Sequence, residues 1–174
     1  MRGFAYVLLT LFTLLVGLPA YAATLGVYQS NTQRAVGRIE FRWLGFSVYN
    51  ATLFSPTGRF DAGSPYVLEL TYQRALSGGA VAQTSLNEMR RLGFNNPSKA
   101  ANWQVQLTDW FSGIEKGTKL AAMRNANGST TFIRNGKQVL GTIADPTFTR
   151  YFFGIWLDEN SRAPKLRNQL IGLN

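Results

Sequence analysis

DPTFTRYFFGIWLDENSRAPKLRNQLIG, residues 145–172, holds the clearest helical pattern in the chain and indicates how a sheet would be covered. Asp145 followed by Pro146 is typical of a helix start, because the carboxylate can cap free backbone N–H groups and proline suits the first turn. Large apolar side chains then recur at helical spacing, at Phe148, Phe152, Ile155 and Trp156. Such a stripe is more often core than cofactor site, so it is predicted to pack against a sheet.

Three strands are predicted in the part of the chain that follows residue 35. Residues 36–43 and 66–74 alternate between apolar and polar positions, and residues 46–54 are rich in β-branched and aromatic side chains. Both patterns are typical of strands, because successive side chains in a strand point to opposite faces. A loop rich in Gly, Pro and Ser, residues 55–65, separates the second strand from the third.

Two helices and a second group of strands are predicted next. Apolar spacing indicates one helix after Ser77 with a stop at Gly93, and another that begins at Asn96. The three predicted strands that follow are 118–124, 129–134 and 137–143. Asn135-Gly136 lies between the last two of them and is a strong signal for a hairpin turn.

A final helix over residues 162–171, capped by Ser161, is expected to complete the chain. The order is therefore strands, two helices, a strand meander and two helices, without the βαβ alternation of parallel sheets. This order predicts an α+β fold, an open-faced β-sandwich in which helices cover one face of a large antiparallel sheet. Residues 23–174 are expected to form one domain, because that length suits a single core.

The first 22 residues have the pattern of a secretory signal peptide. Arg2 gives a short basic region, FAYVLLTLFTLLVGL is apolar, and Ala20-Tyr21-Ala22 fits a small-residue cleavage site. An uncleaved membrane anchor is the alternative, but the apolar run is short for a full span. The pattern predicts cleavage after Ala22, a periplasmic or secreted protein, and no stable membrane insertion after cleavage.

The composition excludes several kinds of chemistry. The chain contains no cysteine and no histidine, which rules out disulfides, thiolate nucleophiles, His-based catalytic triads and His or Cys metal sites. Its formal net charge of +9 indicates either a solvated basic surface or attraction to anionic small molecules or anionic lipid. Nucleic acid is not expected as a partner, because an exported protein rarely meets it.

No cofactor or metal is predicted from the remaining residues. The carboxylates show no pair with the spacing of an acid–base or metal site. Gly78-Gly79 lacks the following Lys-Ser/Thr that a phosphate loop requires.

Arginines on two predicted strands are candidates for ligand contact. Tyr72 and Arg74 end the apolar face of the third strand, whereas Arg38 and Arg42 lie opposite the apolar face of the first. A guanidinium beside an apolar cavity suits a carboxylate or phenolate, because it stays charged and offers two parallel hydrogen bonds. The alternative is a structural salt bridge at the edge of the sheet, with Glu40 as the partner.

Four stretches occur in this order between residues 36 and 172: GRIEFRWLGFSVYNATLF, LELTYQRALSGGAVAQTSLNEMRRLG, NGKQVLGTIADPTFTRYFFGIWL and PKLRNQLIG. Together they resemble the bacterial exported branch of the chalcone isomerase-like family and cover most of the chain. The resemblance implies that family's open-faced β-sandwich, in agreement with the order of elements above.

The plant enzymes of this family cyclise a chalcone without a cofactor. An arginine holds a phenolate, and hydroxyl groups stabilise the developing enolate, so a chain without His or Cys is chemically admissible. On this resemblance Ser47 stands where the enzymes have a strand threonine, and Asn87 where they have an asparagine. Arg42 and Arg38 both compete for the place of the arginine.

Two pocket groups of the enzymes have no counterpart here. Ala80 stands near the place of a tyrosine, and Gly154 near the place of a polar side chain on the penultimate helix. Other members of the family resemble fatty-acid binders, so the sequence predicts a non-catalytic binder of a small amphipathic carboxylate such as a fatty acid. The predicted ligand contacts are Arg38, Arg42, Ser47, Tyr72, Arg74 and Asn87. A cofactor-free intramolecular lyase of the chalcone isomerase type and an envelope protein-interaction module are the alternatives.

Overall fold

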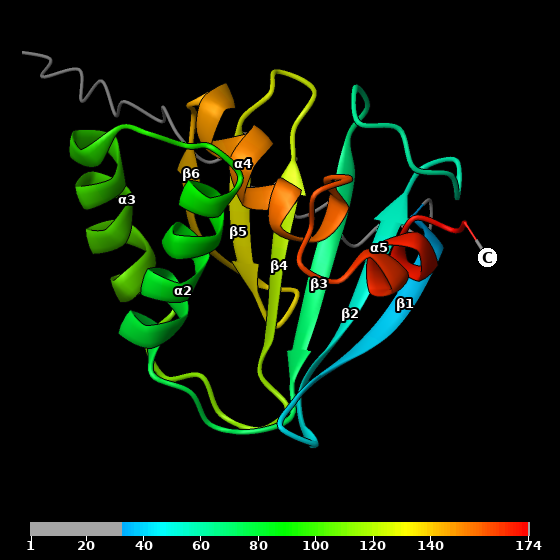
Figure 1. Ribbon diagram of the computed structural model, residues 1–174, viewed down its shortest axis with the longest axis horizontal. Helices are drawn as coiled ribbons and strands as arrows, with labels where there is room; N and C mark the ends of the chain where they lie inside the picture. The colour runs from blue at the N-terminus through cyan, green and yellow to red at the C-terminus, as the bar shows by residue number, and fades with distance from the viewer. Residues whose placement is uncertain (1–32, 174) are drawn as a thin grey trace, which may run out of the picture.

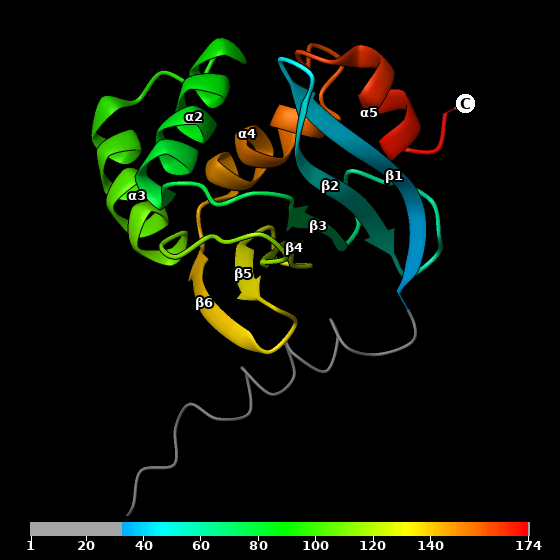
Figure 2. The same cartoon turned by 90° about the horizontal axis from the view of Figure 1, so that it is seen from below.

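The computed structural model describes residues 33–173, in which a six-stranded antiparallel sheet carries helices on one face (Figures 1 and 2). The strands are β1 Arg34–Trp43, β2 Phe46–Ser55, β3 Tyr66–Tyr72, β4 Lys119–Arg124, β5 Thr130–Arg134 and β6 Gln138–Ile143. The helices are α2 Gly78–Arg91, α3 Pro97–Trp110, α4 Pro146–Leu157 and α5 Pro164–Leu170. The predicted signal peptide, residues 1–22, lies outside the described range.

The sheet order follows the chain from β1 to β6, and every neighbouring pair is antiparallel. β3 and β4 are therefore adjacent, although α2 and α3 lie between them in the sequence. The predicted α+β class, with helices over one face of an antiparallel sheet, is confirmed. Among the described residues, no helix combines the length and apolar character that crossing a bilayer would require.

Side-chain caps fix the starts of three helices. The Asp145 carboxylate accepts a hydrogen bond from Thr147 N at 2.9 Å, and Asn96 Oδ1 accepts one from Lys99 N at 3.0 Å. Ser77 Oγ accepts a longer one from Ala80 N at 3.4 Å. These bonds satisfy backbone N–H groups that the first turn of a helix leaves free, and the cap at Asp145 is the one that the sequence predicted.

The last helix differs from its prediction. It begins at Pro164 with Ala163 as N-cap, and no side-chain hydrogen bond caps it, so the predicted cap at Ser161 is wrong. Proline favours the first helical position and disfavours a helical conformation of the residue before it, which moves the start two residues past the predicted 162. Ser161 consequently lies in the connection between α4 and α5.

The predicted aromatic stripe of α4 packs on the sheet. Phe148 and Phe152 are buried and stack with ring centroids 5.1 Å apart, and Phe152 lies edge-on to Phe132 of β5 at 5.2 Å. At the other end of the sheet, α5 lies directly on β1. A Cβ at Gly37 would overlap the carbonyl oxygens of Gln169 and Leu170, so this approach requires glycine.

Two hairpin turns in the sheet have similar backbone conformations and different sequences. The β1–β2 turn places Leu44 at φ 48° and Gly45 at φ 85°, and the β5–β6 turn places Asn135 at φ 51° and Gly136 at φ 70°. Two successive residues with positive φ are what a type I′ turn requires, and Asn-Gly is the pair it favours. Leucine is a rare choice for such a position.

Candidate functional site

A cavity of about 630 Å³ lies between the helices and the sheet. Its walls come from strands β1 to β5, from α2, α4 and α5, from the end of α3, and from the β3–α2 and α4–α5 connections. Most of the lining side chains are aliphatic or aromatic, including Ile39, Phe41, Trp43, Val48, Leu68, Leu70, Val81, Phe111, Leu120, Phe152, Ile155 and Leu166. Cavities that hold small molecules have this size and this apolar character.

Strand alternation and one bulge build the sheet side of the cavity. Ile39, Phe41 and Trp43 alternate along β1 and all line the cavity. On β2 the register shifts between the pairs Phe41↔Tyr49 and Arg42↔Ser47, which leaves Val48 as the extra residue. Because of this bulge, Val48 and Tyr49 both line the cavity, although they are consecutive in the chain.

Phenol groups lie against one wall of the cavity. Tyr49 stacks on Phe41 with ring centroids 5.0 Å apart and meets Tyr72 edge-on at 6.0 Å. Trp156 Nε1 donates a hydrogen bond of 2.9 Å to the Tyr49 hydroxyl, which joins α4 to β2. Burial raises the pKa of Tyr49 to about 12 despite that hydrogen bond, and burial also raises the pKa of Tyr72. Both phenols therefore stay protonated at neutral pH.

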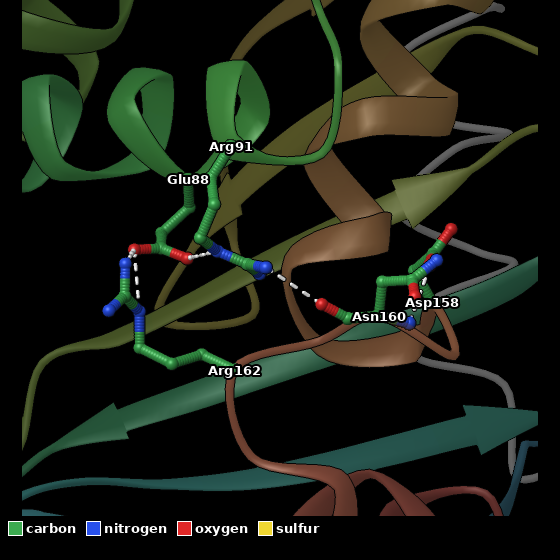
Figure 3. Close-up of polar contacts among 5 residues, drawn as sticks. All are labelled: Glu88, Arg91, Asp158, Asn160 and Arg162. Atoms are coloured by element: carbon green, nitrogen blue, oxygen red, sulfur yellow. Dashed lines mark hydrogen bonds and ion pairs between the residues drawn. The ribbon is translucent and has the colours of Figure 1, made fainter.

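An ion-pair cluster joins α2 to the α4–α5 connection at the rim of the cavity (Figure 3). Glu88 accepts from Arg91 Nε at 2.7 Å and pairs with Arg162 Nη2 at 2.8 Å. Arg91 Nη1 also donates to the backbone oxygen of Asn160 at 2.8 Å. Burial alone would raise the pKa of Glu88, but the hydrogen bonds from Arg162 and Arg91 bring it below its usual value, so this carboxylate stays charged.

Arginines supply the positive charge around the cavity. Arg74, Arg162 and Arg167 all line it. Arg167 Nε donates to Leu157 O at 2.9 Å, and Arg162 is held by Glu88. Arg74 makes no hydrogen bond or ion pair with any other residue in the 33–173 range, which leaves its guanidinium open to a ligand.

One hydroxyl in the cavity wall lacks a partner. Ser161 lines the cavity and is buried, and its Oγ makes no hydrogen bond within the described part of the chain. A buried hydroxyl without a partner is destabilising, and a bound ligand or water could satisfy it.

Two of the six residues predicted as ligand contacts line the cavity, namely Tyr72 and Arg74. They lie there because side chains continue to alternate between the two faces of the sheet beyond Tyr72, the last residue of β3. Gln73 N still donates to Val48 O at 2.9 Å, so Arg74 follows Tyr72 on the same face.

The other four predicted contacts are not among the lining residues, namely Arg38, Arg42, Ser47 and Asn87. Arg42 pairs with Glu40 at 3.2 Å and donates to Gly45 O at 2.6 Å, so its guanidinium binds its own hairpin. It lies across from Ser47, on the opposite face to the cavity-lining residues of β1. Asn87 is exposed and accepts from Gln83 and Arg90 on the surface of α2.

The positions that the resemblance aligned with pocket groups of the enzymes fall in different places. Ala80 lines the cavity but carries only a methyl group. Gly154 is buried beneath Leu92, whose Cδ1 would be 3.2 Å from an added Cβ. These positions place no hydroxyl or amide in the cavity.

The sequence patterns did not predict several residues that line the cavity, namely Tyr49, Glu88, Ser161, Arg162 and Arg167. Tyr49 depends on the β2 bulge, for which the alternation gives no signal. The Glu88–Arg162 pair joins residues 74 positions apart, so only the packed fold brings it together. No group of three carboxylates within residues 33–173 is arranged to hold a metal ion.

Comparison with known proteins finds a relative by sequence and solved structures of similar fold. No protein-family model matches the chain. An uncharacterized protein of Haemophilus influenzae (strain ATCC 51907 / DSM 11121 / KW20 / Rd) is 30% identical over 138 residues, which are 79% of this chain and 67% of the relative. The crystal structure of an Arabidopsis thaliana fatty-acid binding protein, AtFAP1, matches with a TM-score of 0.64 and 10% identity, over 82% of this chain and 88% of that one.

The structural match shows the fold alone, because the two sequences are only 10% identical. The six-stranded antiparallel sheet with its helices is the chalcone isomerase-like fold that the sequence predicted. The sequence match shows a shared family, because it has 30% identity and extends over 67% of the relative's length. The chain therefore has the chalcone isomerase-like fold and belongs to the same protein family as the Haemophilus influenzae protein.

Proposed function

We propose that this protein binds a small amphiphile with an anionic head, such as a fatty acid, in the cavity between its sheet and its helices. The observation that carries the proposal is an apolar cavity of about 630 Å³ with arginines around it. The Arabidopsis thaliana protein with the same fold is described as a fatty-acid binding protein, which supports this class of ligand.

The apolar wall favours a hydrocarbon tail. Each methylene group that leaves water for such a surface contributes about 0.8 kcal/mol. Affinity should therefore rise with chain length until the cavity is full.

Arg74 is the best candidate to hold the head. The Arg162 guanidinium already faces the Glu88 carboxylate, whereas Arg74 has no partner among residues 33–173. A carboxylate beside Arg74 would form a charge-assisted hydrogen bond, for which the fork of the guanidinium is well suited.

The phenols support binding more than catalysis. Because burial raises the pKa of Tyr49 to about 12, its hydroxyl is a neutral hydrogen-bonding group and a poor base at neutral pH. Tyr72 lies beside it, and burial raises its pKa too. Both can orient a polar head without reacting with it.

We also propose that the protein acts outside the cytoplasm. The basic, apolar and small-residue segments of residues 1–22 support export. Cell fractionation with N-terminal sequencing of the extracted protein would test this. Recovery from the cytoplasm with residues 1–22 intact would exclude it.

Titration of the delipidated protein with saturated fatty acids of increasing length would test the ligand class. Arg74→Gln is expected to weaken binding by about 10- to 100-fold, the usual effect of losing a charge-assisted hydrogen bond. Arg38→Gln is the matched control, because it removes the same charge from an exposed residue that does not line the cavity. Absence of fatty-acid binding by the unmodified protein, or an equal loss in both variants, would contradict the proposal.

A further inference from the structure

The end of the β1–β2 hairpin exposes large apolar side chains. Trp43 is 62% exposed, Leu44 81% and Phe46 67%, and Trp43 pairs across the turn with Phe46. Only two other large apolar side chains among the described residues are exposed to 60% or more, Val105 on α3 and Leu173 near the C-terminus. Apolar exposure is therefore concentrated within four consecutive positions.

Folding alone gives no reason for this choice of residues. Leu44 contributes nothing to the core, and its positive φ is a conformation that a branched side chain disfavours. The β5–β6 turn has a similar backbone conformation with the polar pair Asn135-Gly136, so the sheet can form such a turn without exposed apolar groups.

The exposed tip is continuous with the cavity. Trp43 belongs to the tip and also lines the cavity, together with Phe41 and Val48 behind it. In Figure 2 the end of the hairpin lies on the same side of the sheet as the helices. Trp43 thus connects the exposed tip to the lining of the cavity.

The charge around the tip is positive. The side chain of Arg42 lies beside the turn and donates to Gly45 O, and Arg74 directly follows Gln73, whose N–H donates to Val48 O at 2.9 Å. The carboxylates on these walls, Glu40 and Glu88, are each in an ion pair with an arginine. The whole chain has a formal net charge of +9.

We propose that this tip, residues 43–46, docks the protein on an anionic lipid bilayer. Tryptophan favours the membrane–water interface, and basic side chains near it are attracted to anionic lipid. A four-residue turn is too small to bury the roughly 800 Å² that each partner contributes to a stable protein interface, whereas a bilayer accepts a few inserted side chains. If the cavity binds an amphiphile as proposed above, the tip provides an apolar path between bilayer and cavity.

Co-sedimentation of the purified protein with vesicles tests the docking without any cavity ligand. The vesicles are phosphatidylethanolamine with about one quarter phosphatidylglycerol, and phosphatidylcholine alone is the uncharged comparison. The protein is expected to bind the anionic vesicles, and added salt should weaken this binding. The double variant Leu44→Ser, Phe46→Ser should bind at least about tenfold more weakly, because both apolar groups are lost from the contact.

Val105→Ser is the matched control, because it removes an apolar side chain that is 73% exposed on α3, and it should bind like the unmodified protein. Neither Leu44 nor Phe46 lines the cavity, so fatty-acid titration of the double variant checks its fold and tests the cavity separately. Equal vesicle binding by the double variant, or no vesicle binding by the unmodified protein, would overturn the docking proposal. Concentration-dependent dimerisation that the double variant loses, without vesicle binding, would assign the tip to a second copy instead.

Discussion

The two hairpin turns of the sheet adopt similar backbone conformations and connect to the rest of the molecule in different ways. Around the β5–β6 turn, Arg134 and Asn135 bind other parts of the fold. Arg134 donates to the backbone oxygens of Trp110 at 2.8 Å and Ser112 at 2.6 Å, and Asn135 Oδ1 accepts from Lys119 N at 2.9 Å. Around the β1–β2 turn, the polar contacts stay within the hairpin.

Arg42 is the counterpart of Arg134 in the first hairpin, but both of its partners, Glu40 and Gly45, belong to β1 or to the turn. The side chains of that turn are exposed and apolar, as described for Trp43, Leu44 and Phe46. The comparison indicates that the second turn stabilises the sheet, whereas the first presents a surface. Substitutions at equivalent positions should then have unequal, and in one case opposite, effects on stability.

The largest effect is expected for Arg134→Met. The change removes the hydrogen bonds that connect β5 to the end of α3 and should lower the free energy of unfolding by about 3 kcal/mol. Arg42→Met is the matched variant in the other hairpin and should cost less than about 0.5 kcal/mol, because its partners are exposed. Urea unfolding followed by circular dichroism measures both. Similar losses in the two variants would refute the distinction between the hairpins.

A smaller loss, about 2 kcal/mol, is expected for Asn135→Leu. Leucine at φ 51° is strained, and the hydrogen bond from Lys119 N is lost with the amide. The same unfolding measurement applies, with Asn127→Leu in the β4–β5 connection as a control for an added leucine. That control has an effect of its own, because Asn127 Oδ1 accepts from Ser129 N and Ser129 Oγ. In Asn135→Leu the free energy of unfolding should therefore fall by more than the loss of the hydrogen bond from Lys119 N explains, because leucine at this φ adds strain.

Local sequence patterns predicted most of the fold because they act over a few residues. The alternation of residues 36–43 and 66–74 gave β1 and β3, and Asn96 and Asp145 marked helix starts that the structure confirms. The start of α5 was misplaced because Ser161 and Pro164 both resemble start signals, and proline prevailed.

The residues that line the cavity were predictable only where they follow the apolar–polar alternation of a strand. Tyr72 and Arg74 were found by counting along one face of a strand, and both line the cavity. Tyr49 was missed because an extra residue in β2 changes the register, and the bulge has no sequence signature here. Arg162 was missed because its position depends on α2 packing near the α4–α5 connection, a contact between distant parts of the chain.

The reciprocal change, Leu44→Asn, should stabilise the protein by about 0.5–1 kcal/mol. Asparagine tolerates positive φ better than leucine, and no buried contact of Leu44 is lost. The stability of the variant should rise because asparagine fits the turn conformation better, and its binding to vesicles should fall because the tip loses an apolar side chain. Urea unfolding and vesicle co-sedimentation of the same sample test both parts. A loss of stability would mean that Leu44 packs in a way its exposure does not indicate.

The smallest change in stability, less than about 0.5 kcal/mol, is expected for Glu40→Gln, because the Arg42–Glu40 pair is exposed and Arg42 keeps its bond to Gly45 O. The change nevertheless leaves an uncompensated guanidinium beside the tip, which should strengthen binding to anionic vesicles by roughly fivefold. Asp109→Asn removes the same charge from the exposed surface of α3, away from the hairpin, and should have less effect. If both variants strengthen binding equally, net charge rather than the β1–β2 tip governs the attraction to lipid.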